Sequence, residues 1–305
     1  MTIAPASTPS PATSREMAIN AMQVDFRSAI RNRDYRLLIS LPASPAPAGG
    51  YPVVYLIDGN LHFGIAVDTM RIQACWPDVR DAVIVGIGYP TDRVAEALAL
   101  RMDDLTTPLG EAMARNAWFE RMPPPPNGFG RMDDYLRMLD EEVKPLVEGI
   151  VRIDPADQTL MGHSLGGLTT LHALFRRTSS FQHFVAIAPS IWWNDREVLQ
   201  HETGFVQRLR AGEVTARTLI SVGGLESSLR YPSTGRDKLP AGEELFQQMT
   251  DYCRMVPNTE ELGARLAAEQ RPGFEAQTVV HHGDDHNMVP PAGIARGIRF
   301  ALRNE

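Results

Sequence analysis

The sequence contains very little cysteine. Cys75 and Cys253 are the only two cysteines in 305 residues, and they lie far apart in the chain. Two distant thiols form neither a disulfide framework nor the closely spaced ligand set of a zinc site. We therefore expect unpaired structural thiols, no bound metal and no cofactor.

The sequence also lacks a cluster of positive charge. The formal net charge is −7, and the Lys and Arg residues are scattered along the chain. Proteins that bind nucleic acid concentrate positive charge on one face or along one helix. A nucleic-acid partner is therefore not expected.

Long apolar runs are absent as well. No stretch approaches the roughly 18 uninterrupted apolar residues that cross a bilayer. Residues 1–14 are rich in Pro, Ala, Ser and Thr, without the basic start and apolar run of a signal peptide. We expect a short disordered tail over 1–14, no association with a membrane and a cytoplasmic location.

The apolar residues that are present predict an α/β fold. With 43% apolar residues, the chain can bury one large core, which favours a single domain over 15–305. Residues 35–41 alternate as in an antiparallel opening strand, whereas 52–57 and 82–88 are continuous apolar runs typical of parallel strands covered on both faces. Helical intervals separate them from later strands, which predicts a mostly parallel, doubly wound sheet. The later strands are expected at 184–188, 218–222 and 276–280.

One long segment breaks this alternation. Between residues 91 and 131 the pattern becomes irregular and includes four consecutive prolines, Pro123 to Pro126. Long irregular segments in compact domains are usually functional or disordered. Since helical periodicity resumes over 132–147, we interpret 91–131 as an insertion over the active site.

A Gly-x-Ser-x-Gly motif is the strongest chemical signal. Gly162, Ser164 and Gly166 follow a short apolar strand and precede leucines at helical spacing. Such a turn exposes the serine oxygen at a tight corner at the end of the strand, which makes Ser164 the candidate nucleophile. The alternative is a glycine-rich loop with a serine that has no chemical role.

A serine nucleophile needs a base that takes its proton and a third group that orients the base. In this fold the order along the chain is serine, acid, histidine. His286 lies in a polar loop after the last strand, where its ring could reach the serine. We assign His281 and His282 to the end of that strand instead.

The last strand leads to the histidine, and the acid should lie in the loop after the preceding strand. Glu226 occupies this place, directly after the strand at 218–222. Asp195 is the second choice, and Asp284 or Asp285 could also serve. Glu226 is therefore the leading candidate for the third member of a triad.

Two backbone N–H groups should stabilise the oxyanion of the intermediate. One is that of Leu165, and the other is that of Gly59 or Asn60, in the turn after an earlier strand. Asp58 is expected to hold this turn by bonding nearby N–H groups.

Two further histidines have no predicted role in the chemistry. We expect His163 to be packed and hydrogen-bonded, because its place in the motif directs it towards neighbouring structure. His62 follows the Asp58 turn and either packs there, reaches the surface or lines the pocket.

Several motifs together resemble the putative-esterase family of α/β-hydrolases. They are Tyr55-Leu56-Ile57-Asp58-Gly59-Asn60, Gly86-Ile87-Gly88-Tyr89, Gly162-His163-Ser164-Leu165-Gly166-Gly167, Ala188-Pro189-Ser190-Ile191-Trp192-Trp193 and Gly283-Asp284-Asp285-His286. The resemblance extends from about residue 18 onward. It is strongest to siderophore esterases that hydrolyse ferric enterobactin and related trilactones.

The resemblance implies roles for particular residues. Ser164 and His286 match the nucleophile and base, and Leu165 with the Asp58 turn matches the oxyanion region. Arg101 matches an arginine that contacts the substrate, for which a ferric siderophore anion is a candidate. Some members use a Ser–His dyad, and the presence of Glu226 favours a full triad. The prolines at 123–126 depart from the family pattern.

These observations predict a serine esterase that acts on siderophore-type or similarly bulky esters through an acyl-serine. A general carboxylesterase or an acyltransferase on small acyl or aryl esters is the alternative among enzymes. A hydrolase-fold protein that only binds a ligand is the alternative outside them, and it would lack a triad member.

Overall fold

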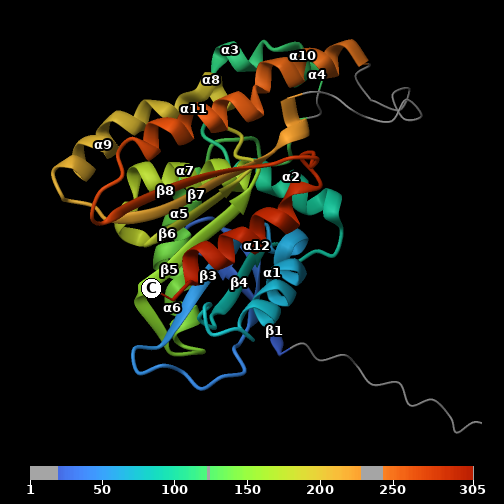
Figure 1. The fold of residues 1–305 in the computed structure, drawn as a ribbon. Coiled ribbons are helices and arrows are strands. Elements are labelled where there is room, and N and C mark those ends of the chain that lie inside the picture. Colours follow the sequence, from blue (N-terminus) through green and yellow to red (C-terminus); the bar gives the residue numbers. More distant parts are fainter. Residues whose placement is uncertain (1–19, 122–123, 228–242, 305) are drawn as a thin grey trace, which may run out of the picture.

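A single mixed sheet organises the chain. The computed structural model describes residues 20–121, 124–227 and 243–304. Its eight strands run in the order β1-β2-β4-β3-β5-β6-β7-β8, with helices on both faces (Figure 1). The predicted α/β-hydrolase architecture is therefore confirmed. The predicted tail at 1–14 lies outside the described residues.

The sheet combines an antiparallel edge with a parallel centre. β1 pairs with β2 and β2 with β4 in antiparallel fashion, and all later pairs are parallel. The fully buried β3 is the continuous apolar run seen in the sequence. The strands are β1 (Ala21–Ser28), β2 (Arg33–Ser40), β3 (Tyr51–Ile57), β4 (Val83–Gly88), β5 (Ile153–His163), β6 (His183–Ile187), β7 (Ala216–Gly223) and β8 (Phe274–His281).

Two helical layers cover the sheet. On one face α1 (Gly59–Gln73) and α12 (Val289–Leu302) pack together, and their apolar residues share a core with the strands. On the other face α7 (Leu165–Arg176) lies against β5 and β6. Three further helices share the core of that face: α5 (Met132–Met138), α9 (Glu202–Arg210) and α11 (Met255–Ala267). Apolar faces on both sides explain why the central strands lack alternation.

The segment from 91 to 131 is more regular than the sequence suggested. It contains α2 (Val94–Asp104) and two short helices, α3 (Glu111–Ala114) and α4 (Ala117–Arg121). The irregular pattern arises because α2 buries Arg101, Asp103 and Asp104 beside Ala97. Pro123 lies outside the described residues.

Buried charges fasten α2 to the opening hairpin. The Arg31 guanidinium bonds to Asp103 at 2.6 Å and to Asp104 at 2.8 Å, and the Tyr35 hydroxyl donates to Asp104 at 2.7 Å. The Asp104 side chain is completely buried. Buried charges are tolerated where each has a hydrogen-bonded partner, so this network fixes the carboxyl end of α2.

A group of four helices lies near one edge of the sheet. In Figure 1 α3, α4, α8 (Trp193–Arg196) and α10 (Glu243–Cys253) lie together at the top of the view. α3 contacts α8, and α4 contacts α10. None of the helices in the described ranges is both long and apolar enough to span a bilayer.

Candidate active site

The turn between β5 and α7 places Ser164 in a strained conformation. Its backbone angles are φ 61° and ψ −118°, a region that residues with a side chain rarely occupy. Its N–H donates to the Ile187 carbonyl of β6 at 2.9 Å, and its own carbonyl accepts from Leu168 and Ser190. The surrounding chain thus holds the strain and presents the hydroxyl at the strand end.

The glycines of the motif are required by close packing. A Cβ on Gly162 would lie 2.4 Å from the carbonyl carbon of Gly166. No side-chain carbon fits at that distance, because β5 and the first turn of α7 pass directly over each other. The sharpness of the corner therefore depends on glycine at position 162.

His286 lies beside the serine hydroxyl. It belongs to the loop between β8 and α12, and its Nε2 lies 3.0 Å from Ser164 Oγ. The His286 side chain is 39% exposed, so the ring borders solvent. A neutral imidazole at this distance can take the hydroxyl proton.

Glu226 lies on the other side of the same ring. Its Oε2 is 2.6 Å from His286 Nδ1, and its Oε1 accepts from the Gly223 N–H at 2.7 Å. The Glu226 side chain is only 2% exposed. Because Gly223 fixes one carboxylate oxygen, the other is held towards the imidazole and favours the proton on Nδ1.

The other acids have different partners. Asp195 is exposed and pairs with Arg196. Asp285 accepts from the N–H groups of Asn287 and Met288, and the carbonyl of Asp284 accepts from Leu225. The structure therefore brings only Glu226, among the four candidate acids, to the imidazole of His286.

The predicted oxyanion donors occupy two neighbouring helix starts. Leu56 of β3 pairs with Met161 of β5, so Gly59 and Ser164, each three residues farther along, come to the same edge of the sheet. Gly59 begins α1 and Leu165 begins α7. The first N–H groups of a helix have no partner within it and are free to bind an anion.

The side chain of Asn60 has a structural role. Its Oδ1 accepts from the Tyr89 N–H at 2.7 Å, and its Nδ2 donates to the carbonyls of Tyr89 and Thr91 at 2.9 Å. These bonds connect the start of α1 to the end of β4. The side chain of Asn60 is therefore not available to an oxyanion, and only its backbone N–H is a candidate donor beside those of Gly59 and Leu165.

Asp58 has a partner that the sequence did not indicate. It makes no side-chain bond to the helix start, and instead its carboxylate forms a two-pronged ion pair with Arg101, at 2.9 and 2.7 Å. Nη2 of Arg101 also donates to the His163 carbonyl at 3.1 Å. The expected bonding of Asp58 to nearby N–H groups was wrong.

The imidazoles of His163 and His62 lie in a row next to that of His286. The His163 ring centre lies 4.6 Å from that of His286 and 5.4 Å from that of His62. Burial holds the pKa of His62 below its usual value and that of His163 well below it, so both rings are neutral. His163 is packed as expected, although its Nε2 has no hydrogen-bond partner among the described residues.

A second serine lies beside Ser164 and was not singled out from the sequence. The Ser190 hydroxyl follows β6, is buried, and lies 3.4 Å from Ser164 Oγ. Its position after a strand adjacent to β5 is the signal that could have identified it. Its hydroxyl can donate to Ser164, whereas the two imidazole nitrogens of His286 bond to Ser164 and Glu226.

Aromatic residues connect the insertion to the segment after Ser190. Phe119 of α4 and Phe129 pack against Trp193, with ring centres 5.8 and 5.4 Å away. Tyr252 of α10 contacts Trp192. Parts of the 91–131 segment therefore lie close to the site in space.

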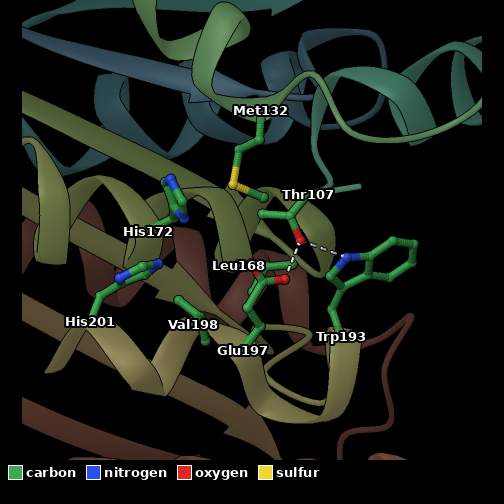
Figure 2. A pocket seen from close by; sticks show the side chains of 8 residues that line it. All are labelled: Thr107, Met132, Leu168, His172, Trp193, Glu197, Val198 and His201. Carbon is green, nitrogen blue, oxygen red and sulfur yellow. Dashed lines mark hydrogen bonds between the residues drawn. The ribbon is translucent and has the colours of Figure 1, made fainter. Parts of the chain in front are cut away.

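Trp193 of this aromatic cluster also lines a small cavity. Figure 2 shows Thr107 bonded to both Trp193 and Glu197, with His172 and His201 on the opposite side. The cavity holds about 10 Å³, enough for a single water molecule. It is therefore too small for an ester substrate. Within the described ranges no group of three or more acidic, His or Cys side chains is arranged to hold a metal ion.

The sequence matches the family described as putative esterase over residues 28–253. A ferri-bacillibactin esterase of Bacillus subtilis is 33% identical, covering 95% of this chain and 92% of the relative. A siderophore enterobactin esterase of Emericella nidulans is 32% identical, covering 95% of each chain. These similarities extend over nearly the full length of all three proteins.

The fold has a similarly complete counterpart among solved structures. The crystal structure of the BES protein from Bacillus cereus superposes with a TM-score of 0.77 at 28% identity. The match covers 97% of this chain and 99% of that one. The whole arrangement of sheet and helices is therefore shared with that protein.

Proposed function

Because the chain belongs to the putative-esterase family, we propose that it is a serine esterase in which Ser164, His286 and Glu226 form the catalytic triad. The observation that carries the proposal is the continuous hydrogen-bonded line from Ser164 Oγ through the His286 ring to Glu226. Each of the three residues comes from a different loop at one edge of the sheet.

In the first half of the reaction Ser164 Oγ attacks the ester carbonyl carbon, and His286 Nε2 takes the hydroxyl proton. Glu226 stabilises the imidazolium that forms. The N–H of Leu165 and that of Gly59 or Asn60 bind the oxyanion, where each donor contributes about 2.7–4 kcal/mol. Collapse of the intermediate breaks the ester bond, and the imidazolium returns its proton to the departing alcohol.

In the second half a water molecule replaces the alcohol. His286 takes one proton from the water as its oxygen attacks the acyl carbon. The new tetrahedral intermediate then collapses with cleavage of the bond between the acyl carbon and Ser164 Oγ. The carboxylic acid leaves, and the imidazolium returns its proton to Oγ. The glutamate keeps the ring in the correct tautomer through both halves.

We propose siderophore-type esters as the substrates. Two relatives named for siderophores resemble this chain over nearly its full length. They are named for different siderophores, so the substrate class is better supported than one compound. A small-molecule ester is thus the proposed partner, and the predicted cytoplasmic location stays a prediction.

The nucleophile can be tested with a pair of serine variants. Ser164→Ala should abolish both ester hydrolysis and labelling by a fluorophosphonate. Ser190→Ala removes a buried hydroxyl only 3.4 Å away and should leave the labelling in place, because the two ring nitrogens of His286 bond to Ser164 and Glu226. Hydrolysis that survives in Ser164→Ala would overturn the proposed role.

The substrate class needs a separate competition assay. Wild-type enzyme is given a ferric trilactone siderophore together with p-nitrophenyl esters of increasing acyl length. A higher kcat/KM for the trilactone is expected. Indifference to the trilactone, with rapid turnover of the aryl esters, would favour a general carboxylesterase.

A further inference from the structure

The buried Asp58–Arg101 ion pair joins three segments that surround the reacting atoms. Asp58 lies between the end of β3 and the start of α1, and Arg101 lies in α2. The Arg101 guanidinium bonds to Asp58 and also to the backbone carbonyl just before Ser164. Asp58 is 5% exposed and Arg101 is 8% exposed. This pair takes no part in the proton transfers described above.

The backbone of Asp58 needs external support. Its φ of 61° and ψ of 47° are left-handed, a conformation that is unfavourable for residues with a side chain, although Asp and Asn adopt it more often than most. Such conformations persist only where the surroundings fix them. Both carboxylate oxygens of Asp58 are bonded to Arg101, so the fork of the guanidinium fixes the side chain and, through it, the turn.

The direction of the next N–H groups depends on this turn. Gly59 and Asn60 follow Asp58 directly and begin α1. We infer that Arg101 is a positioning residue for the oxyanion site, holding the Asp58 turn and the Ser164 corner in register through its three hydrogen bonds. This inference rests on the proposed esterase function and assigns Arg101 a role other than the substrate contact implied by the resemblance.

The surroundings of Arg101 suit this role. Its helix is fastened at the next turn by the bonds of Arg31 and Arg33 to Asp103 and Asp104. The guanidinium therefore projects from a fixed support. Its Nη1 has no hydrogen-bond partner among the described residues, so a direct contact with substrate is the competing role that an experiment must separate.

The test uses an uncharged ester, p-nitrophenyl acetate, so that no ion pair with the substrate can contribute. Lysine keeps the charge of Arg101 but cannot form the two-pronged pair. We expect Arg101→Lys to lower kcat by about 10- to 100-fold, as small misplacements of catalytic groups do, with KM changed by less than about threefold. Rates are expressed per active site, counted by fluorophosphonate titration.

Arg217→Lys is the matched control. Like Arg101, Arg217 bonds one carboxylate and one backbone carbonyl, those of Glu275 and Phe300, but it lies at the start of β7, away from α2 and the Asp58 turn. It should lower the melting temperature and leave kcat within about threefold of wild type. If both variants lose the same stability and the same kcat, the Arg101 ion pair has only a general structural role, and the inference is wrong.

Two further outcomes would overturn the inference. In the first, Arg101→Lys keeps the wild-type kcat on the neutral ester and raises KM only for an anionic ester, which would indicate that Arg101 contacts the substrate. The other applies if Arg101→Lys does not fold: Asp58→Asn removes the same pair, and full kcat in that variant would refute the positioning role. A wild-type protein that hydrolyses no ester would instead refute the proposed function.

Discussion

The bond between Glu226 and His286 can be broken without changing the shape of the site. In Glu226→Gln the new amide has one carbonyl oxygen and one NH₂ group. The Gly223 N–H donates at 2.7 Å to the position of Oε1, so the amide oxygen must occupy that position. The NH₂ group is then directed towards His286 Nδ1, which in wild type lies 2.6 Å from Oε2.

The consequence is a change of tautomer. An NH₂ donor facing Nδ1 requires Nδ1 to accept, which moves the ring proton to Nε2. The imidazole then donates to Ser164 and can no longer take its proton. The corresponding Asp→Asn change in the triad of a serine protease lowers kcat by about 10,000-fold, and we expect a loss of that order here.

The assay is steady-state hydrolysis of p-nitrophenyl butyrate, with rates per titrated active site. Glu197→Gln is the control, because Glu197 bonds to Thr107 and Asn194 and not to the triad. Its kcat should stay within about tenfold of wild type. If Glu226→Gln also stays within tenfold, the reasoning is refuted, and Ser164 and His286 work as a dyad.

Two further predictions concern the motif and the acid stability. Gly162→Ala places a methyl group 2.4 Å from the Gly166 carbonyl carbon and should destabilise the protein by about 1–3 kcal/mol, measured by urea unfolding. Gly64→Ala is the control: its methyl group meets no atom within 4 Å and should not destabilise the protein. Asp133 bonds to His172, which lowers the Asp133 pKa from 3.8 to about 2. Because its pKa is lower in the folded state, Asp133 stabilises the fold above pH 4, and this stabilisation is lost as the pH falls towards 2. Asp133→Asn should therefore reduce the difference in unfolding free energy between pH 6 and pH 2.5. An unchanged difference would contradict this prediction.

Much of the fold could be predicted because its signals are local. The continuous apolar runs became β3 and β4, and the glycine-serine corner became the β5–α7 turn. That Ser164 and His286 lie close together could be predicted because each follows the end of a strand, where side chains of a parallel sheet converge. The strand order explains why residues distant in the sequence meet at this edge.

The missed features depend on contacts between distant residues. The α2 helix was not predicted because its buried face carries Arg101, Asp103 and Asp104, whose partners lie far away in the sequence. For the same reason Asp58 was assigned to its own turn and not to Arg101. Charged residues carry no periodic signal of burial until their partners are known.

The most direct test of the account is to locate the covalent adduct on the enzyme. The protein is treated with a fluorophosphonate, digested, and the peptides are analysed by mass spectrometry. We expect one modified peptide, carrying the label on Ser164, and its disappearance when His286 is replaced by Ala. A label on Ser190, or labelling that does not depend on His286, would contradict it.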